Sequence, residues 1–304
     1  MKEDEMLKIV VPGSTANLGP GFDSVGLAVS RYLTLDVRLA RTWSFTPKTA
    51  EVSDIPRGTD NLVYKVANET AKAHGRQLPS CEVDVYSDIP FTRGLGSSAA
   101  AVVAGIELAD ALLELGLTRE QKMELATRYE GHPDNVGASL YGGLVIGCYR
   151  EAGVDVVHVP ELAIELVAII PAYELETKKA RGQLPEQWMR QQAVEASAIS
   201  NVLVAALLTK NWKLAGRMMA ADLFHQPYRK SLVPELERAQ ALAEEYEAIG
   251  AALSGAGPTV LVFAEPGKGE QLERQLRPHF PACEVTWLAI EPHGSRVYKL
   301  ALEA

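Results

Sequence analysis

The stretch Pro90-Phe91-Thr92-Arg93-Gly94-Leu95-Gly96-Ser97-Ser98-Ala99-Ala100-Ala101 decides how the fold of this chain is interpreted. Before it, Cys81, Val83 and Val85 alternate with polar residues, a pattern that predicts a β-strand. After it, residues 97–115 are rich in Ala, Leu and Val and contain no proline, which predicts a helix. The order strand, glycine turn, helix places the positive end of a helix dipole beside a flexible backbone. Such a site suits a phosphate group.

Two glycines and two serines give this loop its chemistry. Gly94 and Gly96 allow a positive φ and have no Cβ to hold a ligand away from the main chain. Ser97 or Ser98 is expected to cap the first turn of the helix. The loop is not a Walker A motif, because no lysine follows Gly96. A phosphate bound here would need backbone amides, a metal ion and side chains from elsewhere. The alternative is an ordinary tight turn that leads into a buried helix.

The composition narrows the class of protein. With 304 residues, 47% hydrophobic and 23% charged, the chain is typical of a soluble globular protein of one large or two ordinary domains. Its net charge of −9 argues against a nucleic-acid or anionic-membrane surface. Cys81, Cys148 and Cys283 fit neither a disulfide framework nor a zinc site, so we expect three core cysteines in a reducing compartment. The N-terminus lacks signal-peptide features and no apolar run reaches membrane-spanning length, so we expect a cytoplasmic protein.

Periodicity and capping signals predict strands and helices in both halves, hence an α+β fold. A first strand is expected at 7–11, ended by Pro12-Gly13, and a half-buried strand at 31–39. Thr118 opens a helix with a capping-box pattern, and Pro133 breaks the chain after it. The polar bend at 150–155 is the candidate domain boundary. Further strands are expected at 144–148, 154–159, 164–171, 260–264 and 283–290, and further helices at 61–72, within 185–208, and at 212–223, 234–246 and 271–279.

One polar turn could hold a metal ion. Glu130 stands at a helix end beside His132, Asp134 and Asn135. Magnesium prefers oxygen ligands, and Glu130 with a loop hydroxyl such as Ser98 would supply them. Taken alone, a glutamate at a helix end such as Glu130 is more often a solvated carboxylate, and a lone histidine such as His132 is more often a structural hydrogen-bonding group than a base.

Two further groups of residues could recognise a charged substrate. Asn17 and Asp23 flank Gly19-Pro20-Gly21, although turns favour these residue types for backbone reasons. Arg181 and Arg229 could each hold a carboxylate through paired N–H donors, although a lone arginine is usually a solvated charge.

Taken together, these segments resemble the GHMP kinases, the superfamily of galactokinase, homoserine kinase, mevalonate kinase and phosphomevalonate kinase. Residues 90–101 are similar to its phosphate loop, residues 14–23 to its first motif in the homoserine kinase form, and residues 254–259 to its third motif. The segments that are also similar to homoserine kinases are 130–135, 177–181 and 225–229. Because the matches run in the family's order from about residue 8 to 260, the chain is identified as a member of the homoserine kinase branch.

The resemblance implies the fold and the activity. Residues 1–155 would form a domain like the second domain of ribosomal protein S5, with a left-handed βαβ crossover through the Ser97 helix. Residues 156–304 would form a ferredoxin-like domain. The implied activity is ATP-dependent phosphorylation of the side-chain hydroxyl of L-homoserine to O-phospho-L-homoserine, a step of threonine biosynthesis that uses Mg²⁺. The expected partners are ATP, L-homoserine and a second copy of the chain in a homodimer, with no nucleic acid and no membrane.

The resemblance also implies roles for individual residues. Ser98 and Glu130 would hold the magnesium ion, and Asn61 would lie near the adenine. The triphosphate would be bound by the loop of Pro90, Phe91, Thr92, Arg93, Gly94, Leu95, Gly96, Ser97, Ser98, Ala99 and Ala100. The residues that would surround homoserine are Asn17, Asp23, His132, Asp134, Asn135, Thr177, Arg181 and Arg229. In this arrangement the arginines take the carboxylate and the acids take the ammonium group.

The residues expected to be catalytic are Glu130, Asp134 and Asn135. Several relatives use an aspartate in this region as a proposed base, and here Asp134 and Asn135 are adjacent, so a one-residue register decides which meets the hydroxyl. Phosphoryl transfer depends on positioning and charge neutralisation more than on early deprotonation. We therefore favour Asn135 to orient the hydroxyl and Asp134 to bind the ammonium, with no strong base.

Two alternatives stay open at this point. The chain could be another GHMP small-molecule kinase, for example one that acts on mevalonate. Mevalonate carries no ammonium, so Asp23 and Asp134 would then lack a partner. It could also be a non-catalytic nucleotide-binding protein on the same fold, which loss of the metal carboxylate would favour, but Glu130 is present.

Overall fold

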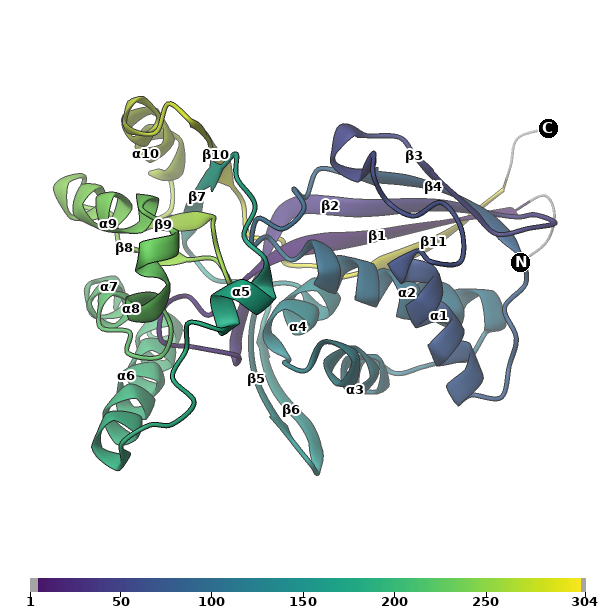
Figure 1. The fold of residues 1–304 in the computed structure, drawn as a ribbon, viewed down its shortest axis with the longest axis horizontal. Coiled ribbons are helices and arrows are strands. Elements are labelled where there is room, and N and C mark those ends of the chain that lie inside the picture. The colour runs from purple at the N-terminus through teal and green to yellow at the C-terminus, as the bar shows by residue number, and fades with distance from the viewer. Residues whose placement is uncertain (1–4, 302–304) are drawn as a thin grey trace.

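The structure is a computed structural model that describes residues 5–301. Residues 1–4 lie outside the described residues. They make up most of the N-terminal segment that was expected to lack a signal peptide. Two β-sheets organise the rest, one for each half of the chain, and they stand side by side in Figure 1.

The larger sheet has seven strands and belongs mostly to the first half. Its main path runs in the order β11-β1-β2-β4-β3, and β5 pairs with both β2 and β6. The strands are β1 (Glu5–Ala16), β2 (Val25–Leu39), β3 (Ser44–Pro47), β4 (Cys81–Ser87), β5 (Leu144–Arg150), β6 (Gly153–Val159) and β11 (Arg296–Ala301). Because β11 pairs with β1, the chain returns at its end to the sheet where it began.

β1 extends into the polar segment that begins at Ser14, which differs from the prediction. The expected strand ended at Pro12-Gly13, but β1 continues to Ala16, and its pairing with β2 shifts register between Pro12 and Gly13. A β-bulge accommodates proline inside a ladder, so the strand passes the signal that was taken as its end. Ser14 and Thr15 consequently lie within the strand, and both are fully buried.

Four helices of the first half cover one face of this sheet (Figure 1). They are α1 (Leu62–Ala73), α2 (Ser97–Leu113), α3 (Arg119–Glu130) and α4 (Asp134–Tyr141). α2 lies at their centre, in contact with α1, α3 and α4, which explains why its sequence is apolar on almost every side. The predicted capping box of α3 is confirmed, because Thr118 and Gln121 exchange both hydrogen bonds.

The connection from β4 to β5 runs through α2, α3 and α4. Both strands pair antiparallel with β2 and are therefore parallel to each other. The left-handed sense of this crossover stays a prediction from the family resemblance.

The second sheet is antiparallel, in the order β10-β7-β9-β8, and confirms the ferredoxin-like expectation. Strands and helices alternate as β-α-β-β-α-β, with α5 to α9 in the first crossover and α10 in the second. The strands are β7 (Glu165–Pro171), β8 (Gly250–Leu253), β9 (Val260–Ala264) and β10 (Cys283–Leu288). The helices are α5 (Thr177–Arg181), α6 (Arg190–Leu208), α7 (Trp212–Ala220), α8 (Gln226–Arg229), α9 (Glu235–Glu245) and α10 (Gly269–Leu276). Three short 3₁₀ turns lie at Ala50–Val52, Lys230–Leu232 and Arg277–His279.

The two halves share a hydrophobic core. One buried cluster includes Leu18 and Val29 of the first half with Leu203 and Phe263 of the second. The predicted boundary after residue 155 falls inside β6, which stays paired with β5 in the first sheet. The division into 1–155 and 156–304 therefore stays a prediction, and the structure adds that β11 crosses back over it.

The cysteines correct one expectation. Cys81 is buried as predicted, but Cys283 is half-buried and Cys148 is exposed. The pairing of β5 with β2 ends at Ile146, so Cys148 lies on the part of β5 that pairs with β6 alone. That hairpin projects from the body of the protein (Figure 1), and a two-stranded ribbon has no core to bury a side chain.

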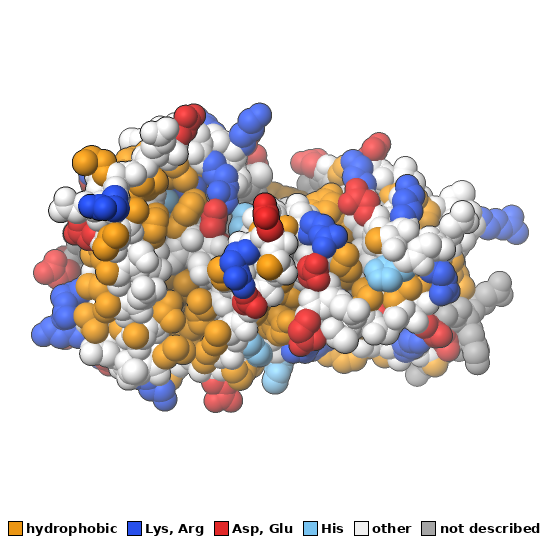
Figure 2. Space-filling model, turned by 90° about the horizontal axis from the view of Figure 1, so that it is seen from below, with side chains coloured by type: hydrophobic (Ala, Val, Ile, Leu, Met, Phe, Trp, Pro, Cys, Tyr) orange, Lys and Arg blue, Asp and Glu red, His pale blue; other side chains and the backbone are white. Residues whose placement is uncertain are grey.

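The helix α6 presents apolar side chains to the outside. By length and composition alone it is the one helix within residues 5–301 that could cross a membrane, a test that core helices of water-soluble proteins also pass. It was not singled out from the sequence. Figure 2 shows hydrophobic side chains gathered on the left of the molecule seen from below, where α6 lies. Val194 and Leu208 on this helix are 66% and 46% exposed.

Candidate active site

The glycine loop enters α2 with a strained backbone that only glycine adopts without cost. Gly94 has φ +82° and Gly96, the N-cap of α2, has φ +75°. A Cβ on Gly94 would overlap with the carbonyl of Ser254, and one on Gly96 would overlap with the hydroxyl of Ser14. The loop is therefore pressed against two other segments of the chain.

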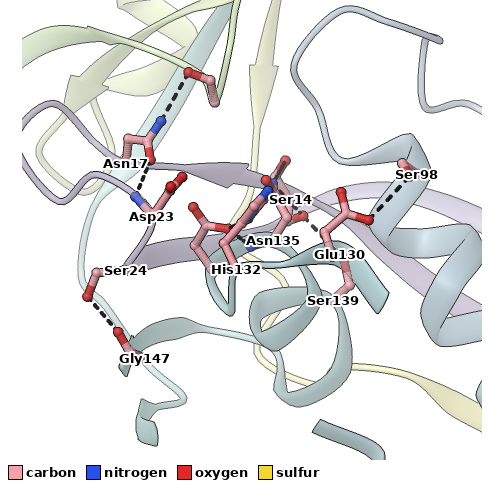
Figure 3. A network of polar contacts seen from close by, with 12 residues as sticks. Ser14, Asn17, Asp23, Ser24, Ser98, Glu130, His132, Asn135, Ser139 and Gly147 are labelled. Atoms are coloured by element: carbon pink, nitrogen blue, oxygen red, sulfur yellow. Dashed lines mark hydrogen bonds and ion pairs between the residues drawn. The ribbon is translucent and has the colours of Figure 1, made fainter. Parts of the chain in front are cut away.

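The prediction that a serine caps α2 is wrong. No side chain caps this helix, because Gly96 takes the N-cap position and both serines fall inside the first turn. Ser98 Oγ instead hydrogen-bonds to Glu130 Oε2 at 3.4 Å (Figure 3). The first N–H groups of α2 are left without a side-chain acceptor, the condition that anion binding needs.

The side chains of the loop point in different directions. Leu95 and Ala100 are fully buried, so they could meet a ligand through backbone groups only. Arg93 donates from Nε to the carbonyl of Pro171 and from Nη2 to that of Ala172, which ties the loop to the end of β7. The charge of Arg93 is thus directed at the second half of the chain.

One polar cavity of about 140 Å³ brings together every residue predicted to contact the acceptor substrate or the metal. Its lining includes Asn17, Asp23, Ser98, Glu130, His132, Asp134, Asn135, Thr177, Arg181 and Arg229. These residues come from the loop after β1, the start of α2, the end of α3 and the turn after it, the start of α4, and from α5 and α8. The N-terminal turn of α2 and the Gly255–Gly257 segment complete the wall.

Glu130 and Ser98 offer two oxygen atoms side by side at this wall. Burial raises the pKa of Glu130, and the nearby Asp134 acts in the same direction. A carboxylate in such a position gains from a cation, which would replace the hydration that it has lost. Hydroxyl and carboxylate oxygens are the ligands that Mg²⁺ accepts, so this donor pair fits the metal expected from the sequence.

His132 and Asp134 form a tight pair on the adjacent wall. His132 Nδ1 lies 2.5 Å from Asp134 Oδ1, and the backbone N–H of Asn135 donates to the same oxygen at 2.7 Å. Burial disfavours the charged imidazole, but the hydrogen bond to Asp134 and the charges of Asp23 and Glu130 outweigh it and raise the pKa of His132. Asp23, His132 and Asp134 also place one ligand-type atom each within 4.8 Å of one another.

Asn135 is anchored by two buried serines. Its Nδ2 donates to Ser14 Oγ at 3.0 Å, and Ser139 Oγ lies 3.2 Å from the same hydroxyl (Figure 3). Because the amide nitrogen is occupied, Oδ1 remains to accept a hydrogen bond from the cavity.

Asp23 is positioned by its neighbours and paired with α5. Its backbone N–H donates to Asn17 Oδ1 at 3.0 Å, and its two carboxylate oxygens accept from Arg181 Nη1 and Nη2 at 2.9 and 2.7 Å. The partners that the sequence assigned to opposite ends of the substrate thus contact each other. Since a carboxylate oxygen accepts more than one hydrogen bond, Asp23 can hold Arg181 and a further donor together.

Arg229 is buried deeper than any other large charged side chain of the site. It is 1% exposed, and its guanidinium lies 5.5 Å above the ring of Phe22, as does that of Arg181. Burial and the neighbouring charge of Arg181 lower the pKa of Arg229 to about 10, so it stays protonated at neutral pH. A buried cation next to another cation favours a bound anion.

A second cavity of about 250 Å³ opens on the other side of the loop and is largely apolar. Ser97, Ser98 and Thr92 line both cavities, so the two meet at the start of α2. Asn61 lies in its wall as the N-cap of α1, where its side chain accepts from Val63 N and donates to Pro56 O.

Comparison with known proteins agrees with this geometry. The family model described as "GHMP kinases N terminal domain" matches residues 61–143, and that described as "GHMP kinases C terminal" matches residues 203–282. The homoserine kinase of Bacillus velezensis is 55% identical over 304 residues, covering 100% of this chain and 98% of the relative. The chain belongs to the homoserine kinase family of the GHMP kinases.

Other family members support the assignment over the whole chain. The homoserine kinase of Bacillus licheniformis is 55% identical, covering 97% of this chain and 96% of the relative. The crystal structure of homoserine kinase from Cytophaga hutchinsonii superposes with a TM-score of 0.86 at 28% identity, covering 98% of each chain. The GHMP kinase fold predicted from the sequence is thereby confirmed.

Several residues that shape the site were not predicted from the sequence. Phe22 and His225 lie within quoted motifs, but an aromatic ring and a histidine carry no signal of their role before their neighbours are known. Ser14 and Ser139 are buried hydroxyls 125 positions apart that meet only in the fold. Gly255 contributes through its carbonyl, which accepts from Asn17 Nδ2 and Arg229 Nη1, and a backbone group leaves no trace in a sequence.

Proposed function

We propose that this chain transfers the γ-phosphoryl group of ATP to the side-chain hydroxyl of L-homoserine and releases O-phospho-L-homoserine. The observation that carries the proposal is the polar cavity, which places three acids and two arginines around one small space beside the open N-terminus of α2. An amino acid with a free hydroxyl presents the matching groups: an ammonium, a carboxylate and an acceptor oxygen.

The nucleotide would lie across the start of α2. The apolar cavity beyond Ser97 and Ser98 suits the adenine and ribose, with Asn61 near the base, and the triphosphate would extend toward the N–H groups of Gly94 to Ala100. Because Thr92, Ser97 and Ser98 line both cavities, the γ-phosphate would lie next to the polar one.

Ser98 and Glu130 would hold the magnesium ion through their oxygen atoms. When bound, the ion neutralises phosphate charge as it develops during transfer. Glu130 gives up no proton in this arrangement; it contributes a negative charge that burial has already made costly to leave unpaired.

The acceptor would be oriented by three contacts. The ammonium would lie among Asp23, His132 and Asp134, where the grouped ligand atoms mark a site that attracts cations. The carboxylate would meet Arg229, and Arg181, which is paired with Asp23, would border the same space together with Thr177 and Asn17. Asn135 Oδ1 would accept the hydrogen bond of the hydroxyl and aim its oxygen at the γ-phosphate.

This arrangement makes a general base unnecessary. In a loose transition state the bond to the attacking oxygen has barely formed, so little positive charge develops on the hydroxyl and its proton need not be removed early. Orientation therefore contributes most of the acceleration. Asp134 is engaged with His132 and with the backbone of Asn135, which suits a binding role.

An ATP-consumption assay with homoserine, mevalonate and galactose, each with and without magnesium, tests the proposal. We expect turnover with homoserine that depends on magnesium, and little with mevalonate, which has no ammonium group for Asp23 and Asp134 to bind. Preferred turnover of mevalonate would identify a different GHMP kinase. Binding of ATP without turnover of any acceptor would identify a non-catalytic nucleotide-binding protein.

We further propose that the chain works in threonine biosynthesis in the cytoplasm, where ATP is supplied, and that it forms a homodimer. The three free cysteines fit a reducing compartment. The exposed apolar side chains of α6 give a second copy a surface to cover. Light scattering coupled to size-exclusion chromatography distinguishes the dimer from a monomer.

A further inference from the structure

His225 is a buried residue to which the proposed function assigns no role. It contacts Arg229, which lines the polar cavity. It is 0% exposed and precedes α8 as its N-cap, with Arg229 four residues further on. His225 Nδ1 lies 3.1 Å from Arg229 Nη1. A fixed imidazole in contact with a substrate-binding guanidinium can determine where that guanidinium points.

The surroundings of the ring define its tautomer. Nε2 lies 2.9 Å from the carbonyl oxygen of Gly19 and 3.4 Å from Asp222 Oδ2, and both of these atoms are acceptors. The proton therefore resides on Nε2, which leaves Nδ1 with a lone pair that faces the donor on Arg229. Burial lowers the pKa of His225 to about 4, so the ring remains neutral at physiological pH.

The other contacts of Arg229 restrict it further. Nε donates to the carbonyl of Ala180 at 3.3 Å, and Nη1 also donates to the carbonyl of Gly255 at 3.1 Å. Phe22 stacks on His225 with centroids 5.5 Å apart and lies beneath the guanidinium. Within residues 5–301, Nη2 of Arg229 has no hydrogen-bond partner, so it is the nitrogen left for the cavity.

We propose that His225 is a positioning residue for Arg229, whose Nη1 donates to the neutral Nδ1 so that Nη2 is aimed at the carboxylate of the acceptor substrate. This inference rests on the proposed function, because it assumes an acceptor that carries a carboxylate. His225 itself touches neither substrate. Its effect should therefore appear in the recognition of homoserine and leave ATP binding unchanged.

Two substitutions test the roles of the two ring nitrogens of His225 one at a time. In His225→Asn the amide oxygen can take the place of Nδ1 and accept from Arg229, while the donor to Gly19 is lost. In His225→Gln the amide nitrogen can take the place of Nε2 and donate to Gly19, while the acceptor for Arg229 is lost. We expect His225→Gln to lower kcat/KM for homoserine roughly tenfold or more, the loss of one hydrogen bond to a charged group, and His225→Asn to lower it much less. The KM for ATP should stay unchanged in both.

Further measurements exclude a merely structural role. His225→Gln added to Arg229→Leu should cause no additional loss, and turnover of 3-aminopropan-1-ol, which lacks the carboxylate, should not respond to it. The proposal would be overturned if both variants lost kcat/KM for homoserine equally and in step with their melting temperatures. A larger loss of kcat/KM in His225→Asn than in His225→Gln would overturn it as well. If neither variant folds, long-range ¹H–¹⁵N NMR of the wild-type ring decides, because a proton on Nδ1 would also overturn it. Failure of the wild type to phosphorylate homoserine would instead refute the proposed function itself.

Discussion

The substitution Asp23→Asn tests the role of this carboxylate in substrate recognition. We expect a small effect on the stability of the protein and a large effect on its activity toward homoserine. The Arg181 and Asp23 side chains are 37% and 33% exposed, so solvent screens the pair. Partly exposed ion pairs contribute about 0–1 kcal/mol, and 1 kcal/mol corresponds to about 2–4 °C in melting temperature for a domain of 150–250 residues. We therefore expect the melting temperature to fall by no more than about 4 °C.

The same substitution should strongly affect the acceptor. A hydrogen bond between charged groups is worth about 1.5–3 kcal/mol, and each 1.4 kcal/mol is a factor of ten. Loss of the carboxylate charge that faces the ammonium should lower kcat/KM for homoserine roughly ten- to two-hundredfold. The KM for ATP should barely move, because Asp23 lines the polar cavity and not the apolar one.

A matched set of acceptors assigns this loss to the ammonium. 3-Aminopropan-1-ol keeps the ammonium and the hydroxyl, whereas 4-hydroxybutanoate keeps the carboxylate and the hydroxyl. Asp23→Asn should reduce turnover of the amine as it does that of homoserine and leave turnover of the acid nearly unchanged. Glu284→Gln serves as the control, because it breaks an ion pair with Arg31 outside either cavity. An equal loss with 4-hydroxybutanoate, or a wild type that prefers 1,3-propanediol, would refute the assignment of Asp23.

Three further predictions follow from the site. Glu130→Gln should abolish most magnesium-dependent turnover while a fluorescent ATP analogue still binds; turnover like that of the wild type at saturating magnesium would contradict the metal role. Gly96→Ala should lower both the melting temperature and kcat, because the new Cβ displaces Ser14 and with it Asn135. The control is Gly75→Ala, at φ +65° with open space around it, which should cost only about 1–2 kcal/mol of backbone strain and no activity. Equal effects of the two substitutions on kcat would argue against the contact between Gly96 and Ser14. His132 has a raised pKa in the folded chain, so the stability it contributes is fully present below its unfolded pKa of about 6.5 and is lost as the pH rises through the folded value. The free energy of unfolding lost in His132→Gln should accordingly be greatest in mild acid and shrink above neutral pH, and a loss that grows with pH would refute the pairing with Asp134.

Part of this protein follows from local rules of sequence. The alternation in β4, the capping box of α3 and the apolar surface of α2 depend on neighbours a few residues apart, so they are visible without a fold. The glycines at 94 and 96 marked the loop correctly because a positive φ is a property of the residue itself.

Local rules failed where a distant segment changed the outcome. The bulge that carries β1 past Pro12 depends on pairing with β2, and the exposure of Cys148 depends on where β5 leaves the sheet. The serine cap of α2 failed because contact with Ser14 leaves room only for glycine at the N-cap.

The sequence supplies the side chains of the site, and the tertiary structure determines which of them come into contact. Asp23 and Arg181 are 158 positions apart and pair through both oxygens of the carboxylate. His225 reaches the carbonyl of Gly19 across 206 positions, and that contact leaves its other nitrogen facing Arg229. A sequence determines which donors, acceptors and charges are available, because these belong to single residues. Which of them become partners is determined by packing, because burial forces each polar group to find its partner among whatever the fold brings near.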